Sequence, residues 1–154
     1  MQTKHFIIAG LCLLCANIGF AQNKLFEKYA DMDGVTSIYI SKAMFQMMPA
    51  FENAGLNLVN MKGKVESLQI LSTSRKDKIP QMKKEFSQLV NKQHQELMRV
   101  RDGKTKATFY ADMNGDKVKN LLMLADTDSS FVVIQLLGNF TLKDIQEITK
   151  DIDK

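Results

Sequence analysis

The chain is poor in the side chains that carry most enzyme chemistry. Its 154 residues include two histidines, two cysteines, two prolines and no tryptophan. Both cysteines, Cys12 and Cys15, lie near the N-terminus in an apolar stretch. If that stretch is cleaved off, the rest of the chain has no thiol and one histidine, His94. Disulfides and cysteine nucleophiles are then excluded, and the fold must depend on its apolar core alone.

The first 21 residues have the three parts of a cleavable signal peptide. Lys4 precedes the apolar run 6–14, and Gly19 and Ala21 are the small residues just before a cut at Gln22. The run is shorter than the roughly 20 apolar residues that span a bilayer. We therefore expect export to the periplasm or cell envelope, and the alternative is an uncleaved N-terminal anchor. Lipidation is disfavoured because Cys12 follows Leu11 and Cys15 follows Leu14, whereas a lipidated cysteine follows small residues.

Residues 22–154 are expected to form a single domain without a membrane-spanning segment. No second long apolar run, no linker rich in proline, glycine or serine and no internal repeat follows the leader. Removal of Lys4 lowers the formal net charge from +4 by one, which is ordinary for a soluble domain. Lysine and arginine do not cluster with aromatic residues, so nucleic acid is not an expected partner.

The hydrophobic periodicity predicts an α+β domain. It indicates helices near 22–31, 42–48, 77–92 and 141–152, a loop over 52–63, and strands near 35–40, 64–73, 97–101, 106–112, 118–125 and 131–137. Hairpin-linked strands favour a mostly antiparallel sheet with helices packed mainly on one face, as a two-layer sandwich. The apolar strand 131–137 is expected at the centre of that sheet.

Three local signals fix turns and helix starts. Asn114-Gly115 is typical of a type I′ hairpin turn, because both residues accept a positive φ. Asp77 is a plausible N-cap before Pro80. Thr141 and Asp144 have the spacing of a capping box. Leu142 and Ile145 then begin the inner face of the last helix.

No catalytic residue, metal site or cofactor is predicted. His94 has no nucleophile or carboxylate close to it in sequence, which favours a solvated loop histidine. The turn 112–116 resembles a calcium loop, but its glycine and its terminal ligand are misplaced for an EF-hand. A hydrolase or metal-dependent enzyme that uses His94 and the aspartate-rich turns is the weakest of three functional hypotheses.

Apolar side chains offer two candidate binding surfaces. The first is a helical stripe of Met44, Met47, Met48 and Phe51, since methionine is common at adaptable binding surfaces. The second is a sheet face, on which strand periodicity separates Val118, Leu122 and Leu124 from Leu121, Met123 and Ala125, and on which Tyr110 and Leu97 point away from the expected core. The alternative is that these residues fill the core, or that the first helix and the loop 52–63 cover them.

Two segments resemble a known family. Residues 34–41, GVTSIYIS, lead into Lys42-Ala43-Met44, and residues 132–142, VVIQLLGNFTL, lead into the last helix. This arrangement is similar to the bacterial domain-of-unknown-function family 4252, small exported proteins of Gram-negative bacteria. The resemblance implies an envelope location and supplies no catalytic residues.

The leading hypothesis is a non-enzymatic envelope module that binds a protein or a small apolar ligand. It would bind through Met44, Met47, Met48 and Phe51 or through Tyr110, Leu121 and Met123. The alternative is an envelope stress or signalling accessory that acts through a membrane-bound partner.

Overall fold

The computed structural model describes residues 23–47, 52–53, 56–57, 63–90 and 92–149. Residues 23–30 are helical. The later elements are β1 (Thr36–Ser41), α2 (Lys42–Met47), β2 (Glu52–Asn53), β3 (Leu56–Asn57), β4 (Val65–Thr73), α3 (Ile79–Leu89), β5 (His94–Asp102), β6 (Thr105–Asn114), β7 (Lys117–Asp126), β8 (Phe131–Thr141) and α4 (Leu142–Thr149). The predicted order of helices and strands is confirmed, and the expected loop 52–63 contains the small β2–β3 pair.

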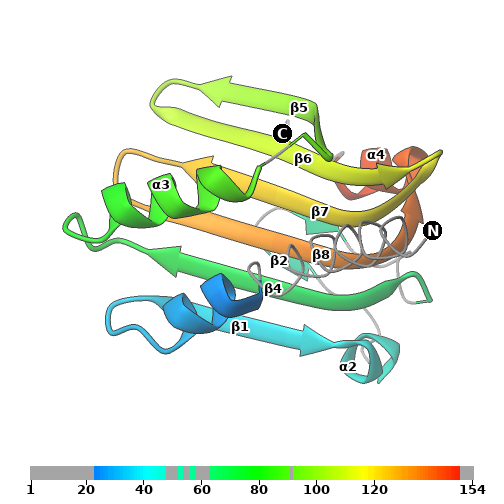
Figure 1. Ribbon diagram of the computed structural model, residues 1–154, viewed down its shortest axis with the longest axis horizontal. Coiled ribbons are helices and arrows are strands. Elements are labelled where there is room, and N and C mark those ends of the chain that lie inside the picture. Colours follow the sequence, from blue (N-terminus) through cyan, green and yellow to red (C-terminus); the bar gives the residue numbers. More distant parts are fainter. Residues whose placement is uncertain (1–22, 48–51, 54–55, 58–62, 91, 150–154) are drawn as a thin grey trace, which may run out of the picture.

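Six antiparallel strands form the main sheet, in the order β1-β4-β8-β7-β6-β5 (Figure 1). The α+β class and the mostly antiparallel sheet are therefore confirmed. β8 is an interior strand between β4 and β7, as its apolar sequence FVVIQLL predicted. Val133 and Ile134 are both buried although they point to opposite faces, so the sheet must be covered on both sides.

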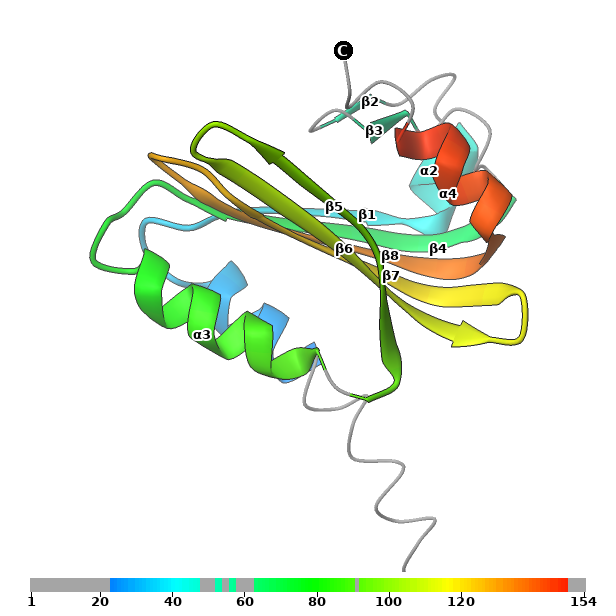
Figure 2. The same cartoon turned by 90° about the horizontal axis from the view of Figure 1, so that it is seen from above.

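One face of the sheet is covered by helix 23–30 and α3 (Figure 2). Phe26 and Tyr29 of the first helix pack against Phe86 of α3, and the Phe26 and Phe86 rings meet edge to face with centroids 5.1 Å apart. Their core on this face also includes Leu71, Met82, Leu122, Phe131 and Val133. An ion pair of 2.9 Å between Lys28 and Glu85 joins the two helices at the surface.

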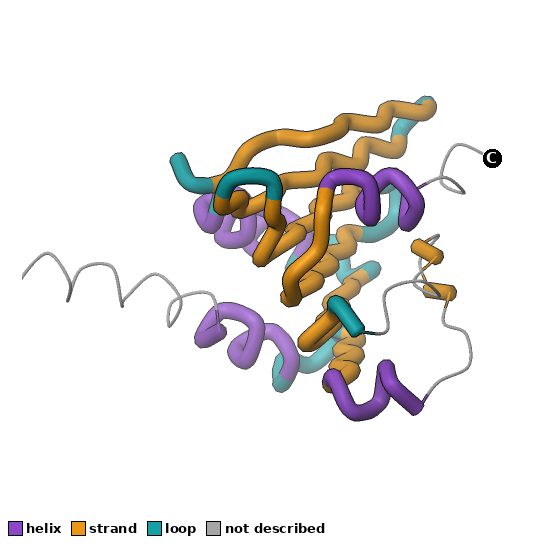
Figure 3. The backbone as a smooth tube through the Cα atoms, turned by 90° about the vertical axis from the view of Figure 1, so that its right-hand side faces the viewer, coloured by secondary structure: helices purple, strands orange, loops and turns teal. Residues whose placement is uncertain are grey.

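The opposite face carries the short helices α2 and α4 at one end of the sheet (Figures 2 and 3). Phe45 of α2 and Ile145 of α4 are buried in this second core. Its sheet residues include Leu68, Ile70, Phe109, Leu121, Met123, Ile134, Leu136 and Phe140. The expected packing on mainly one face thus holds for helix 23–30 and α3, whereas α2 and α4 cover part of the other face, which the two-layer prediction had left open.

The local signals have the predicted outcome in part. Gly115 has φ of 66° in the β6–β7 turn, but Asn114 is the last residue of β6 and pairs with Lys117, so the two turn residues are Gly115 and Asp116 rather than the predicted Asn114 and Gly115. The N-cap of α3 is Lys78 rather than Asp77, because the Asp77 carboxylate binds the Arg75 guanidinium instead of a backbone N–H. Pro80 lies in the first turn of α3, as predicted.

A β-bulge changes the expected faces of β7. Strict alternation placed Val118 with Leu122 and Leu124, but Val118 is buried with Leu121 and Met123. The register with β6 shifts between Asp112 and Met113, where β7 has one residue more than β6, and this extra residue turns Val118 to the other face. All of the apolar residues of β7 from 118 to 123 are therefore buried in one or other core.

Candidate functional site

An apolar pocket lies between α4 and the β5–β6 hairpin. Its volume is about 320 Å³, and its lining residues are Leu97, Met98, Phe109, Leu142, Ile145 and Gln146. Five of these side chains are apolar and none is charged. Its lining residues Phe109 and Ile145 belong to the core on the face of the sheet that α2 and α4 cover only in part.

The capping box at the start of α4 holds that helix beside the pocket. The Asp144 carboxylate accepts hydrogen bonds from the Thr141 N–H at 2.8 Å and from its hydroxyl at 3.0 Å, and the Thr141 hydroxyl accepts from the Asp144 N–H at 3.3 Å. The reciprocal bonds confirm the predicted capping box. Asp144 also accepts a bond of 2.6 Å from the Lys64 ammonium, which ties α4 to the segment just before β4.

These contacts set the charge state of Asp144. The Lys64 ammonium, with the hydrogen bonds from Thr141, holds the pKa of Asp144 below its ordinary value. The carboxylate is therefore charged whenever the helix is docked near neutral pH. The docked helix directs Ile145, which is buried, and Leu142, which is 42% exposed, to the pocket.

A bulge in β5 builds the opposite wall. Consecutive residues of a regular strand point to opposite faces, so Leu97 and Met98 could not both line one pocket. The register between β5 and β6 shifts between Glu96 and Met98, and this irregularity lets both side chains reach it. Phe109 of β6, the residue paired with Met98, completes the wall.

The structure divides the predicted binding residues among three places. Leu121 and Met123 lie on the pocket's side of the sheet, and Met123 pairs with Phe109, but both are buried in the core. Tyr110 is half-buried on the opposite face, against the core of α3. The structure thus joins Leu121 and Met123 to the region beneath the pocket and separates Tyr110 from them.

The methionine stripe lies elsewhere, on α2. Met44 and Met47 are 51% and 79% exposed, while Phe45 between them is the buried residue of the helix. Met48 and Phe51 lie outside the described residues. The two described methionines therefore form an outward surface rather than one wall of the pocket.

Of the six lining residues, sequence reasoning placed only Leu97 on a candidate binding surface, and it missed Met98, Phe109, Leu142, Ile145 and Gln146 as members of the site. Leu142 and Ile145 were expected on the inner face of the last helix, and Leu97 was expected to point away from the core. The available signal for Met98 is the adjacent apolar pair Leu97-Met98 in a strand whose other residues are largely charged or polar. Such a pair indicates a bulge that faces an apolar surface.

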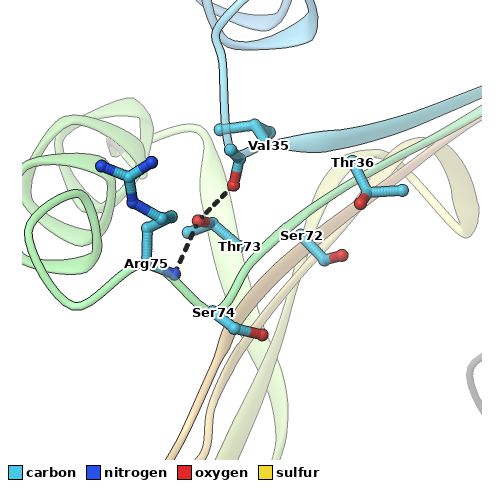
Figure 4. A pocket seen from close by; sticks show the side chains of 7 residues that line it. Val35, Thr36, Ser72, Thr73, Ser74 and Arg75 are labelled. Atoms are coloured by element: carbon cyan, nitrogen blue, oxygen red, sulfur yellow. Dashed lines mark hydrogen bonds between the residues drawn. The ribbon is translucent and has the colours of Figure 1, made fainter.

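A second, polar hollow of about 520 Å³ lies where β1 begins and β4 ends (Figure 4). The Thr73 hydroxyl donates to the Gly34 carbonyl at 2.7 Å and accepts from the Arg75 N–H at 3.1 Å. The Arg75 guanidinium donates to both carboxylate oxygens of Asp77, at 3.0 and 3.1 Å, and holds the pKa of Asp77 below its ordinary value. The Asp77 carboxylate thus neutralises the Arg75 guanidinium, which is the charged group of this hollow. The hydrogen bonds of Thr73 and Arg75 close a turn.

The groups needed by the enzyme hypothesis converge only in part. His94 pairs with Asp112 across β5 and β6, whereas Asp126 pairs with Lys106 at the other end of β6. Six residues of extended strand separate these ends by about 20 Å. The expectation of a solvated loop histidine is wrong, because His94 is the first residue of β5 and is half-buried. Burial lowers the pKa of His94, and the Asp112 charge offsets this in part.

The aspartates between β7 and β8 bind lysines instead. Asp126 forms an ion pair with Lys83, and Asp128 forms one of 3.1 Å with Lys104. Within the described ranges, no three histidine, cysteine, aspartate or glutamate side chains gather in a way that could hold a metal ion. The same ranges contain no helix of the length and apolarity that a membrane crossing requires.

Comparison with known proteins identifies the family of the chain. Residues 29–148 match the protein family described as Domain of unknown function (DUF4252). The match extends from helix 23–30 through the sheet to α4, which covers well over half of the chain. The searches of curated proteins and of solved structures gave no match. The chain therefore belongs to the DUF4252 family.

Proposed function

We propose that the protein is a non-enzymatic module of the cell envelope that binds a small apolar ligand between α4 and the β5–β6 hairpin. The observation that carries this proposal is the composition of the pocket: five apolar side chains and one amide line about 320 Å³. That volume falls at the lower end of the range for small-molecule sites, which are mostly apolar with a few polar groups.

The chemistry of the walls defines the class of ligand. No charged side chain lines the pocket, so the bound part is an uncharged acyl or aromatic group. Burial of apolar surface contributes about 25 cal/mol per Å², and it is the main term available to such a site. Leu142 increases the apolar surface that binding would bury, because this large side chain is 42% exposed and a ligand would cover it.

Fluorescence titration with the apolar dye N-phenyl-1-naphthylamine tests the proposal. The wild-type protein is expected to bind one dye per chain with saturable enhancement. Gln146→Trp fills the pocket from an exposed position on α4 and is expected to weaken dye binding at least tenfold. Lys143→Trp is the matched control, because Lys143 is exposed on the same helix and does not line the pocket.

The two tryptophan variants separate the pocket from general surface stickiness. Both positions are exposed, so both variants should unfold at the wild-type temperature in circular dichroism. Equal dye affinity for the Gln146→Trp and Lys143→Trp variants would contradict the proposal. So would non-saturable binding by the wild-type protein.

A further inference from the structure

The two edge strands of the main sheet differ sharply in how well they are protected against pairing with another chain. Natural edge strands avoid pairing with other chains by means of charges, prolines and bulges. The edge strand β5 has charged residues at Glu96, Arg99, Arg101 and Asp102 and contains a bulge. The other edge strand, β1, reads TSIYIS, with no charge and no proline, and its six residues pair with β4 in unbroken register.

The unprotected edge is also exposed and partly apolar. Thr36 and Ser37 are exposed, and Tyr39 is 65% exposed. Of the four large apolar side chains that are exposed among the described residues, Tyr39, Met44 and Met47 lie on β1 or on the adjoining α2. A free strand edge flanked by exposed apolar side chains is a surface for β-strand addition.

We propose that β1 pairs antiparallel with β1 of a second copy of this chain, so that two sheets become one continuous sheet about a two-fold axis. The charges at the ends of the strand favour this occupant. Asp33 lies in the turn three residues before Thr36, and Lys42, the first residue of α2, immediately follows β1. Antiparallel pairing sets the acidic end of one copy beside the basic end of the other, and two-fold symmetry of adjacent strands is antiparallel by geometry.

The same charges select a register. Residues directly opposite in an antiparallel pair point to the same face, so the two-fold axis must pass through Ile38 or Tyr39. With the axis at Ile38, Ser37 faces Tyr39 of the second copy, and Lys42 at the start of α2 comes to the end of the paired strands beside the turn that holds Asp33. With the axis at Tyr39, the strands shift by two residues and Lys42 lies farther from Asp33. The register centred on Ile38 therefore brings the unlike charges closer.

Light scattering after size-exclusion chromatography tests this pairing on protein purified from cells that express the full chain. The wild-type protein is expected to have the mass of a dimer. The double variant Ser37→Lys with Tyr39→Lys puts like charges directly opposite in this register and is expected to be a monomer. Ser37→Lys with Tyr39→Glu puts unlike charges opposite and is expected to restore the dimer.

A control on the other edge keeps the test specific. Gln95 is exposed on β5, so Gln95→Lys adds the same charge to the sheet edge that is not proposed to pair. This variant is expected to remain a dimer. A monomeric wild-type protein would overturn the proposal, and so would a folded Ser37→Lys, Tyr39→Lys variant that stays dimeric. Loss of the dimer in the Ser37→Lys, Tyr39→Glu variant as well would overturn the register.

Discussion

At the scale of single residues, Asp144 links the Lys64 ion pair to the start of α4 and so to the pocket beside that helix. One carboxylate caps α4 through Thr141 and binds the Lys64 ammonium. No other acidic side chain among the described residues is as buried, since Asp144 is 9% exposed. A change at this carboxylate should therefore act on the position of α4, and through it on Leu142 and Ile145.

Asp144→Asn removes the charge and keeps the shape of the side chain. We expect it to lower the free energy of unfolding by about 1–2 kcal/mol near neutral pH, because charge-assisted hydrogen bonds and helix caps contribute about that much. The measurement is urea unfolding followed by circular dichroism. Asp116→Asn, at an exposed turn position, is the control and should be nearly neutral.

The sign of the pH dependence follows from the lowered pKa of Asp144. Because the folded pKa lies below the unfolded value of about 4, the stabilisation is fully present above about pH 4. It is lost as the pH falls through the folded pKa. The difference in stability between wild-type protein and Asp144→Asn should therefore shrink in acid, and a difference that grows in acid would contradict this assignment.

At the scale of elements, β4 and β8 approach most closely where both are irregular. The Asn139 N–H donates to the Lys64 carbonyl at 2.8 Å, and a Cβ on Gly138 would overlap that same carbonyl oxygen. The register between the strands shifts at this point, between Val65 and Ser67. The end of β8 leads directly into α4, so this contact also positions the pocket.

Gly138→Ala should force the two strands apart at this contact. We expect a loss of about 2–4 kcal/mol in the free energy of unfolding, because backbone atoms on the other strand cannot move aside as a side chain could. Gly63→Ala is the control, since a Cβ there meets open space. Chemical denaturation of both variants checks this, and similar stabilities for the two would show that the strands adjust freely.

The sequence predicted those elements whose signal is local. The apolar run of β8 and the capping box at Thr141 each depend on neighbours in sequence, and both are found, while the turn predicted at Asn114-Gly115 is found one residue later, at Gly115 and Asp116. The side of the sheet that Val118 faces depends on a bulge in β7 opposite β6, which period-two alternation cannot show. The prediction of Asp77 as the N-cap of α3 was wrong for a related reason, because Arg75 binds the Asp77 carboxylate.

The pocket was harder to predict than the strands that build it. Its walls come from β5 and α4, which are separated by three other strands in sequence. Each wall residue was interpretable by itself, with Ile145 on an inner helix face and Leu97 pointing away from the core. Only the tertiary fold places Ile145 beside Leu97, and only the β5 bulge adds Met98.

At the scale of the whole molecule, two cores on opposite faces of one sheet explain stability without disulfides. Tyr29, Met82 and Phe86 cover one face, while Phe45 and Ile145 cover part of the other. The described residues contain no cysteine, since Cys12 and Cys15 both precede them. An export route through an oxidising compartment would thus leave the folded domain chemically unchanged.

Export itself is a prediction about the whole chain. When the full sequence is expressed in a Gram-negative host, we expect a periplasmic protein whose intact mass begins at Gln22, because Gly19 and Ala21 form the small-residue cut site. Ala21→Arg should block cleavage and leave the full-length mass in the membrane fraction, while Asn23→Arg, beyond the cut site, should still be processed. The processed protein should unfold at the same temperature with and without a thiol reductant, because it contains no cysteine. An uncleaved chain in the cytosol would contradict the prediction, since the apolar run 6–14 would then have served neither as leader nor as anchor.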